Sequence, residues 1–248
     1  MDKKRKTVFI LGLALLLCSG GILLNGYLKQ RGSENVYREL AQEMETSPEE
    51  ETQQESLREE PAYAAPVDFE HLRQLNPEVV GWLTIPGTAI DYPILHDPES
   101  NDTYLTRDIE GNESAAGSIY LDCDNAADFS DYHNVIYGHH MRNGTMFADI
   151  MKFRDQEFLE NHQTITIYLP DRELHLCPYA CLYTTPDGFR RKTQFDSREQ
   201  LQEYAEEMVK NATAFIKPEQ EIERLYSLVT CSYEFEDART ILYCYEID

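Results

Sequence analysis

Cys231 is the residue whose chemistry and position first point to a reaction. It ends the apolar run YSLVTC (226–231) and precedes the polar stretch SYEFEDAR (232–239). A thiol at the exit of a predicted strand faces a loop, which is where enzymes commonly hold their reactive side chains. Position alone nevertheless favours a buried structural cysteine, because cysteine is among the most buried residue types. We expect Cys244, inside TILYCYEI (240–247), to be of that structural kind.

A nucleophilic thiol needs a partner that helps to form the thiolate and later protonates the leaving group. His139 and His140 follow the predicted strand that ends at Gly138, and a glycine there allows a close approach of the backbone. A histidine at a strand end can point into a cleft. A single histidine is still more often an ordinary surface or core residue.

Arg239 lies eight residues after Cys231 and opens the next predicted strand. If the two strands pair as neighbours, both side chains lie at the same end of the sheet. A guanidinium there can donate hydrogen bonds to a carbonyl oxygen or an oxyanion. The ordinary alternative is an ion pair with the carboxylate of Glu234, Glu236 or Asp237.

Three segments that carry these residues resemble the signature segments of sortases, the membrane-anchored cysteine transpeptidases of Gram-positive bacteria. They are YGHHM (137–141), LVTC (228–231) and DARTILYCYEI (237–247). Three earlier segments resemble the family in the same order: NPEVVGWLTIPGTAIDYPILH (76–96), NDTYL (101–105) and GSIYLD (117–122). The resemblance covers roughly residues 67–248. The long insert before LVTC resembles class B sortases most.

The resemblance implies a closed eight-stranded barrel with peripheral helices, and it gives roles to individual residues. Cys231 matches the nucleophile, His139 the catalytic histidine and Arg239 the catalytic arginine, so His140 becomes a neighbour of the site. The resemblance also implies that Asn101 and Tyr137 line or support the site. Thr230 and Ser232, the residues on either side of Cys231, are further candidates for binding substrate or supporting the site. Val229 is a departure, because class B enzymes often have serine at that position.

The activity that the resemblance implies is acyl transfer. Cys231 would attack the threonine carbonyl of a surface-protein sorting signal similar to Asn-Pro-x-Thr or Leu-Pro-x-Thr. The resulting thioester would pass to an amine of peptidoglycan or to a pilin lysine. Two alternatives remain: a non-catalytic, membrane-tethered β-barrel binding module, and a papain-like protease. The second is weaker, because in papain-like enzymes the cysteine precedes the histidine.

We expect no cofactor, because this chemistry needs no metal. The sequence contains no Cys-x-x-Cys pair, so a zinc site of the usual spacing is not expected. A calcium site is the alternative, but its four candidate ligands do not form a complete EF-hand loop; they are Asp122, Asp124, Asn125 and Asp128. Cys177 and Cys181 lie four apart in one predicted strand, which puts them on one face but too far apart for a disulfide along that strand.

Eight short runs rich in β-branched and aromatic residues predict the strands of the fold. They cover residues 79–85, 89–95, 117–122, 134–139, 164–169, 174–185, 226–231 and 240–247. Ser197 and Gln200 form a capping-box pattern that opens a predicted helix over 197–214. A second short helix is expected within 147–162. Eight strands with few helices predict a mainly-β fold, a mixed or closed barrel with helices on its rim.

The first 66 residues are of a different kind. Residues 1–6 are basic, and residues 7–28 contain an uncharged stretch of 21 positions, long enough to cross a bilayer as a helix. The basic end predicts a cytoplasmic N-terminus and a catalytic domain, residues 67–248, outside the cell. A cleaved signal peptide is the alternative. Residues 29–66 are expected to be an acidic stalk, in which a short helix could begin at Ser33.

The charge of the chain excludes one class of partner. The sequence has 22 Lys+Arg and 45 Asp+Glu, for a net charge of −23. Six of the basic residues lie within the first 31 positions, so the part expected outside the cell is more acidic still. We therefore expect no nucleic-acid partner, because such proteins show a basic face.

Overall fold

The computed structural model describes residues 19–21, 24, 32, 35–42, 63–186, 188–232 and 237–247. Most of the predicted membrane anchor (7–28) and of the predicted stalk (29–66) lies outside these residues. Among the helices that are described, none combines the length and the apolar character needed to cross a bilayer.

The described residues form nine strands, and eight of them match the predicted runs. They are β1 (Val79–Thr84), β2 (Asp91–Leu95), β3 (Ile119–Leu121), β4 (His133–Tyr137), β5 (Ile165–Tyr168), β6 (Glu173–Thr184), β7 (Ala214–Phe215), β8 (Leu225–Cys231) and β9 (Arg239–Ile247). The sequence does not predict β7, which has only two residues and therefore no alternating pattern to detect.

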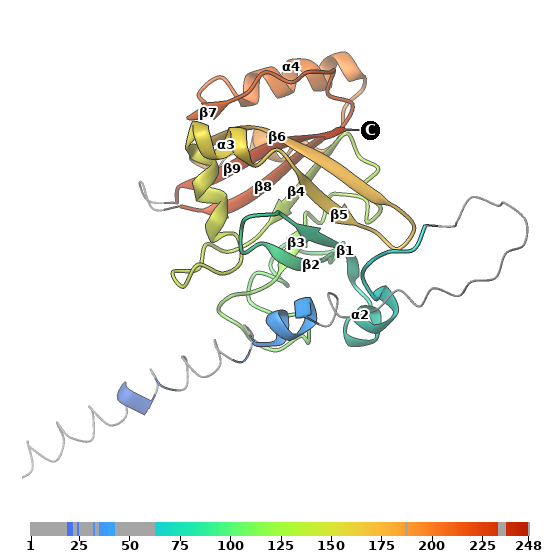
Figure 1. The fold of residues 1–248 in the computed structure, drawn as a ribbon, viewed down its shortest axis with the longest axis vertical. Helices are drawn as coiled ribbons and strands as arrows, with labels where there is room; N and C mark the ends of the chain where they lie inside the picture. Colours follow the sequence, from blue (N-terminus) through green and yellow to red (C-terminus); the bar gives the residue numbers. More distant parts are fainter. Residues whose placement is uncertain are drawn as a thin grey trace, which may run out of the picture.

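The strands close into a barrel (Figure 1). The order is β5-β1-β2-β3-β4-β8-β9-β6, and β5 also pairs with β6, so eight strands form a ring while β7 adds to β6. The pairs β2–β3 and β4–β8 are parallel, and the other pairs are antiparallel. The predicted closed eight-stranded barrel is confirmed. Closure leaves no long unpaired edge in the ring.

Strand β8 lies between β4 and β9, and this arrangement builds the site. β4 runs parallel to β8, with Tyr137 opposite Val229. β9 runs antiparallel, with Arg239 opposite Cys231. The carboxyl ends of β4 and β8 and the amino end of β9 therefore meet at one edge of the barrel.

Short helices cover parts of the barrel. They are α2 (Phe69–Leu75), the 3-10 helix η1 (Ala148–Arg154), α3 (Gln156–Asn161), the 3-10 helix η2 (Gly188–Arg191) and α4 (Arg198–Met208). The predicted helix after Ser197 is confirmed as α4, and the Ser197 hydroxyl accepts the Gln200 N–H at its first turn. The helix expected within 147–162 is present as two pieces, η1 and α3.

Two groups of buried apolar side chains hold the barrel and its covering helices together. The larger one includes the barrel interior, with Trp82, Leu228 and Cys244 fully or almost fully buried. The second one joins α4 to the outer face of β6, β8 and β9. Along α4 it contains Leu201, Tyr204, Ala205 and Met208, whose helical spacing puts them on one side.

Cys177 and Cys181 do not share a face, and that expectation is wrong. Strand β6 contains a register shift between Pro178 and Ala180, so strict alternation is lost between the two thiols. Cys177 packs beside the second apolar group, whereas Cys181 is buried in the larger one. The five described cysteines are all free thiols.

Residues 35–42 are helical and lie against the barrel. Tyr37 and Leu40 are almost fully buried there. The Tyr37 hydroxyl donates to the Gly117 carbonyl (3.2 Å) and accepts the Ile109 N–H (3.2 Å). This part of the predicted stalk is thus packed on the catalytic domain by an aromatic side chain whose polar end is satisfied.

Candidate active site

The end of the β8–β9 hairpin fixes Cys231 and Arg239 opposite each other. They are the last residue pair of the ladder. One step beyond, the Ser232 N–H donates to the Ala238 carbonyl (2.8 Å), which holds the register up to the thiol. The hairpin turns back through Asp237, which has a positive φ of 60°.

Gly138 carries His139 to the same edge. Its N–H donates to the Val229 carbonyl (3.1 Å), extending the β4–β8 ladder past Tyr137. A Cβ at Gly138 would lie 2.4 Å from Ile119 and 2.7 Å from Phe147, so no larger residue fits. The His139 carbonyl then accepts the Phe147 N–H (2.9 Å).

The His139 ring is oriented from its far side. Its Nε2 lies 2.7 Å from the Leu105 carbonyl oxygen. A carbonyl can only accept, so Nε2 carries a proton and donates it to Leu105. Nδ1 is then the ring atom left to interact with the Cys231 thiol.

Cys231 and His139 shift each other's pKa in the directions that favour a thiolate–imidazolium pair. The hydrogen bond to His139 is the main cause that lowers the pKa of Cys231, and the positive charge of Arg239 adds to it against the opposing effect of burial. The hydrogen bond to Cys231 raises the pKa of His139, and the Leu105 carbonyl does so further. The site is therefore arranged to activate the thiol.

The sequence left open that Arg239 forms only a structural ion pair, with Asp237 as one candidate partner. The Arg239 side chain does not form an ion pair with Asp237. Its Nη1 donates to the carbonyl oxygens of Asp237 (3.0 Å) and Ala238 (3.1 Å). Glu234 and Glu236, the other candidate partners, lie outside the described residues. A guanidinium has five N–H donors, so Arg239 keeps donors for a substrate oxygen.

One cavity of about 290 Å³ brings most of the predicted site residues together. Cys231, His139 and Arg239 line it with Asn101, Tyr137 and Thr230. Ser232 is buried and does not line this cavity. His140 does not line it either, and its backbone instead pairs with Met146.

Asn101 and Tyr137 each support a neighbouring element. The Asn101 side-chain oxygen accepts the Cys123 N–H (2.8 Å), which fixes the turn after β3. The Tyr137 hydroxyl donates to the Asp122 carboxylate (2.7 Å), and its ring lies 5.3 Å from that of Tyr120. The two tyrosines form an aromatic wall of the cavity.

Four residues of this region were not predicted: Leu105, Tyr120, Asp122 as a support, and Arg191. Leu105 and Tyr120 lie inside segments that resemble the family, but the resemblance could have suggested a role only for Tyr120, which contributes a side chain. Arg191 lies in the insert that has no matching motif, and nothing in its surroundings signals a role. Only the fold brings it to the cavity wall.

The alternative of a calcium site does not fit the side chains. Ligand atoms of Asp122, Cys123 and Asp124 lie within 4.8 Å of one another, but the Arg191 guanidinium donates to both carboxylates. The Asn125 amide instead contacts Asp131 and the His133 carbonyl. The positive charge beside these carboxylates is therefore the guanidinium of Arg191.

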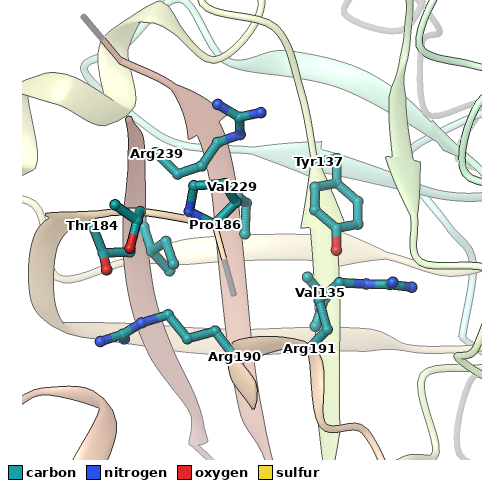
Figure 2. A pocket seen from close by; sticks show the side chains of 10 residues that line it. Val135, Tyr137, Thr184, Pro186, Arg190, Arg191, Val229 and Arg239 are labelled. Carbon is teal, nitrogen blue, oxygen red and sulfur yellow. The ribbon is translucent and has the colours of Figure 1, made fainter. Parts of the chain in front are cut away.

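A second, smaller cavity of about 90 Å³ adjoins the first (Figure 2). The two cavities share Tyr137, Arg191, Val229 and Arg239 as wall residues. Figure 2 shows Arg239 on one side of the smaller cavity, and Arg190 and Arg191 on the other. Thr184, Pro186 and Ile241 complete much of its lining, which is mostly apolar.

A closed β-barrel with an activated thiol at its edge is the architecture of a cysteine-dependent enzyme. The family model described as the sortase domain matches residues 83–247. A sortase B of Listeria monocytogenes is 34% identical over 181 residues, which are 71% of this chain and 72% of the relative. The chain therefore belongs to the sortase family, the cysteine transpeptidases, and its relatives are of class B.

Solved structures agree with this assignment. The sortase B of Clostridium perfringens has a TM-score of 0.67 and 29% identity, over 72% of this chain and 99% of that one. A Staphylococcus aureus sortase B–substrate complex has a TM-score of 0.76 and 24% identity, over 89% of this chain and 99% of that one, which extends the likeness in fold. The expected enzyme is confirmed, and the non-catalytic module and the papain-like protease are not.

Proposed function

We propose that the protein cleaves a sorting signal of surface proteins at threonine and transfers the new carboxyl end to an amine. The observation that carries this proposal is the shared cavity of Cys231, His139 and Arg239, in which the thiol and the imidazole favour each other's charged form. The family resemblance supplies the substrate class. The acceptor would be an amine of peptidoglycan or a pilin lysine.

The first half of the reaction forms a thioester. The Cys231 thiolate attacks the threonine carbonyl carbon, and the negative charge that develops on the oxygen is stabilised by free N–H donors of Arg239. As the tetrahedral adduct collapses, the C–N bond breaks. The protonated His139 gives its proton to the departing amine, which leaves as a neutral group.

The second half reverses these roles. The acceptor amine attacks the thioester carbonyl, and His139, now neutral, takes up the proton that the amine loses. The C–S bond breaks, Cys231 returns as thiolate, and a new amide bond is released. Because Leu105 holds Nε2, the proton moves through Nδ1 in both halves.

The direct test is mass spectrometry of the purified domain with a panel of sorting peptides and an amine. We expect a covalent adduct on Cys231 whose mass equals the peptide fragment ending in threonine. Its loss on amine addition should accompany a new amide product. Cys231→Ala should fold and form no adduct, while Cys244→Ala, a truncation in the core, should still react. Adduct formation by Cys231→Ala would refute the assignment.

We also propose that the domain works outside the cell, tethered by residues 7–28 with residues 1–6 in the cytoplasm. The support is the uncharged stretch and the basic residues that precede it. Such a tether would keep the enzyme at the surface where substrates emerge from the membrane.

A further inference from the structure

An ion pair between buried Asp122 and partly exposed Arg191 joins two elements beside the catalytic cavity. The Asp122 side chain has no exposed surface and follows β3. The Arg191 guanidinium contacts both of its oxygens, through Nε at 2.8 Å and Nη2 at 2.8 Å. This two-point contact is the geometry in which arginine and carboxylate bind most strongly and with a fixed orientation.

Asp122 also connects this ion pair to Tyr137, a residue of the cavity wall. Its carboxylate also accepts the Tyr137 hydroxyl (2.7 Å) and the Asp124 N–H (3.0 Å). Despite burial, which acts in the opposite direction, the bond to Arg191 is the main cause that keeps the pKa of Asp122 below its ordinary value. The Asp122 carboxylate is therefore negatively charged at neutral pH, and both Arg191 and Tyr137 donate to it.

Arg191 is the end of η2, and its neighbours attach the same segment elsewhere. The Lys192 carbonyl accepts from the ring of buried His133 (2.8 Å), and Arg190 donates to the Met208 carbonyl (3.0 Å) and the Tyr243 hydroxyl (2.9 Å). Figure 2 shows Arg190 and Arg191 extending in opposite directions, with Arg191 passing beneath the Tyr137 hydroxyl. Arg191 is thus the contact that holds η2 against the β3 side of the cavity.

Arg191 lines both cavities, and its charge is matched by Asp122. The charged groups with the largest effect on the pKa of Cys231 are instead His139, Arg239 and Asp237. The place of Arg191 in the wall between the two cavities is fixed by the ion pair. Its contribution to the cavities is therefore geometric, because the contact with Asp122 fixes where the end of η2 lies in their shared wall.

We propose that Asp122 and Arg191 are positioning residues that hold η2 as a wall of the substrate groove. This inference rests on the proposed function, because the groove must receive the residues that precede the scissile threonine. Loss of the pair would let η2 move away from β3 and would release Tyr137. Substrate would then bind less tightly, while the thiol and imidazole would keep their activity.

The kinetic test uses Arg191→Lys, Arg191→Gln and Asp122→Asn. Lysine keeps the charge but loses the two-point contact. We expect kcat/KM for a sorting peptide to fall about 10- to 100-fold, as for other changes that misplace a substrate wall, mainly through a higher KM. Arg198→Gln is the matched control, because it breaks an exposed ion pair with Glu223 that lies outside the cavities.

A second measurement needs no substrate. Hydrogen exchange of the amides of residues 188–192 should become at least about tenfold faster in Arg191→Gln, because local opening is easier, and should be unchanged in Arg198→Gln. The rate at which iodoacetamide alkylates Cys231 should stay at the wild-type value in both. Asp122→Asn can fail to fold because it is buried, so Arg191→Lys and Arg191→Gln decide the question.

Three results would overturn the inference. Unchanged exchange at 188–192 in Arg191→Gln would show that the pair does not hold η2. Faster exchange with an unchanged KM would show that the wall does not position substrate. A fall in kcat alone would make Arg191 a catalytic group instead. If the wild type formed no thioacyl adduct with any peptide, the proposed function and the KM effect would fail together, whereas exchange would still test the ion pair.

Discussion

At the scale of residues, the proposed chemistry depends on a proton shared by the Cys231 and His139 side chains. Neither Cys231 nor His139 is fully buried, so both still contact water. Their hydrogen bond lowers the pKa of the thiol and raises that of the imidazole. Each of these shifts increases the fraction of the enzyme in which Cys231 is a thiolate and His139 is an imidazolium.

The first prediction concerns the Cys231 thiolate. In wild type, the pH midpoint for alkylation of Cys231 by iodoacetamide should lie below that of an ordinary cysteine. His139→Ala removes the main cause of this lowering, so the midpoint should rise and turnover should be lost. His140→Ala should change neither by much. Peptide-resolved mass spectrometry separates Cys231 from the other thiols, and equal effects of the two variants would contradict the assignment.

The second prediction concerns Arg239. Arg239→Lys keeps the charge but loses the planar set of donors that can follow a developing oxyanion. We expect kcat and kcat/KM to fall together by about 10² to 10³, as for other oxyanion donors. Thermal melting on the same preparation is the control. A variant that melts earlier but turns over normally would assign Arg239 a structural role only.

The sequence predicted Cys231, His139 and Arg239 as the catalytic residues because their order and spacing match a family pattern, and the fold brings them to one cavity. It could not identify Leu105, whose contribution to the site is a backbone carbonyl that any residue type could provide. Ser232 is a candidate only through its position next to Cys231. Strand alternation turns its side chain inward, so it supports the hairpin through its backbone.

At the scale of elements, the junction after β4 is the most constrained point. Gly138 lies where the strand must pass Ile119 and Phe147 without a Cβ. The same residue aims His139 at the thiol. A single backbone position therefore couples core packing to the orientation of the imidazole.

The third prediction follows from this junction. Gly138→Ala should destabilise the domain by about 1–3 kcal/mol, because the added methyl overlaps two buried side chains. It should also reduce activity more than stability loss alone explains, since His139 is displaced. Gly188→Ala is the control for stability alone, because a Cβ there meets no atom within 4 Å but the residue opens η2. Melting curves check both variants, turnover below the melting range checks Gly138→Ala, and a normally active Gly138→Ala would contradict the coupling.

Elements with a clear alternation or a helical pattern were predictable, and elements fixed by tertiary contacts were not. The strands β1, β8 and β9 lie where their runs were predicted, whereas the register shift in β6 depends on its pairing with β9. The 3-10 helix η2 has no apolar periodicity. Its position is set by polar contacts to residues far away in the sequence, which no local pattern can reveal.

At the scale of the whole molecule, acid stability should depend on buried histidines. Burial lowers the pKa of His133 to about 4 and also lowers that of His96. Between pH 4 and 6.5 the unfolded chain binds a proton at His133 that the folded chain does not. Stability should therefore fall as the pH drops through this window. His139 acts in the opposite direction, because its pKa is raised in the fold.

The fourth prediction measures this dependence. Denaturant unfolding of the wild type should show a loss that approaches about 3 kcal/mol from His133 between pH 7 and pH 4. His133→Gln removes the titrating group, so the slope in this window should become smaller, although stability at pH 7 should drop with the lost bonds to Lys192 and Ser227. An unchanged slope would show that His133 binds its proton in the folded protein.

The fifth prediction concerns orientation in the membrane. Protease added to intact protoplasts of cells expressing the full chain should remove the domain of residues 67–248 and leave cytosolic proteins intact. The basic residues before the uncharged stretch are the reason. Detergent permeabilisation provides the control for protease access. Full protection of the domain in intact protoplasts would reverse the proposed orientation.

The pairing of β9 also decides when the enzyme can form during folding. β9 lies between β6 and β8, and its pairing with both completes the ring. Until it is inserted, Arg239 is not opposite Cys231, and β8 has a partner only in β4, about ninety residues earlier in the chain. The β8–β9 pairing joins residues only eight apart at Cys231 and Arg239, whereas the β4–β8 pairing is long-range, and long-range pairing is slower. We therefore expect Cys231 and Arg239 to meet before His139 reaches them, so that a newly made chain has a thiol well before it has a complete active site.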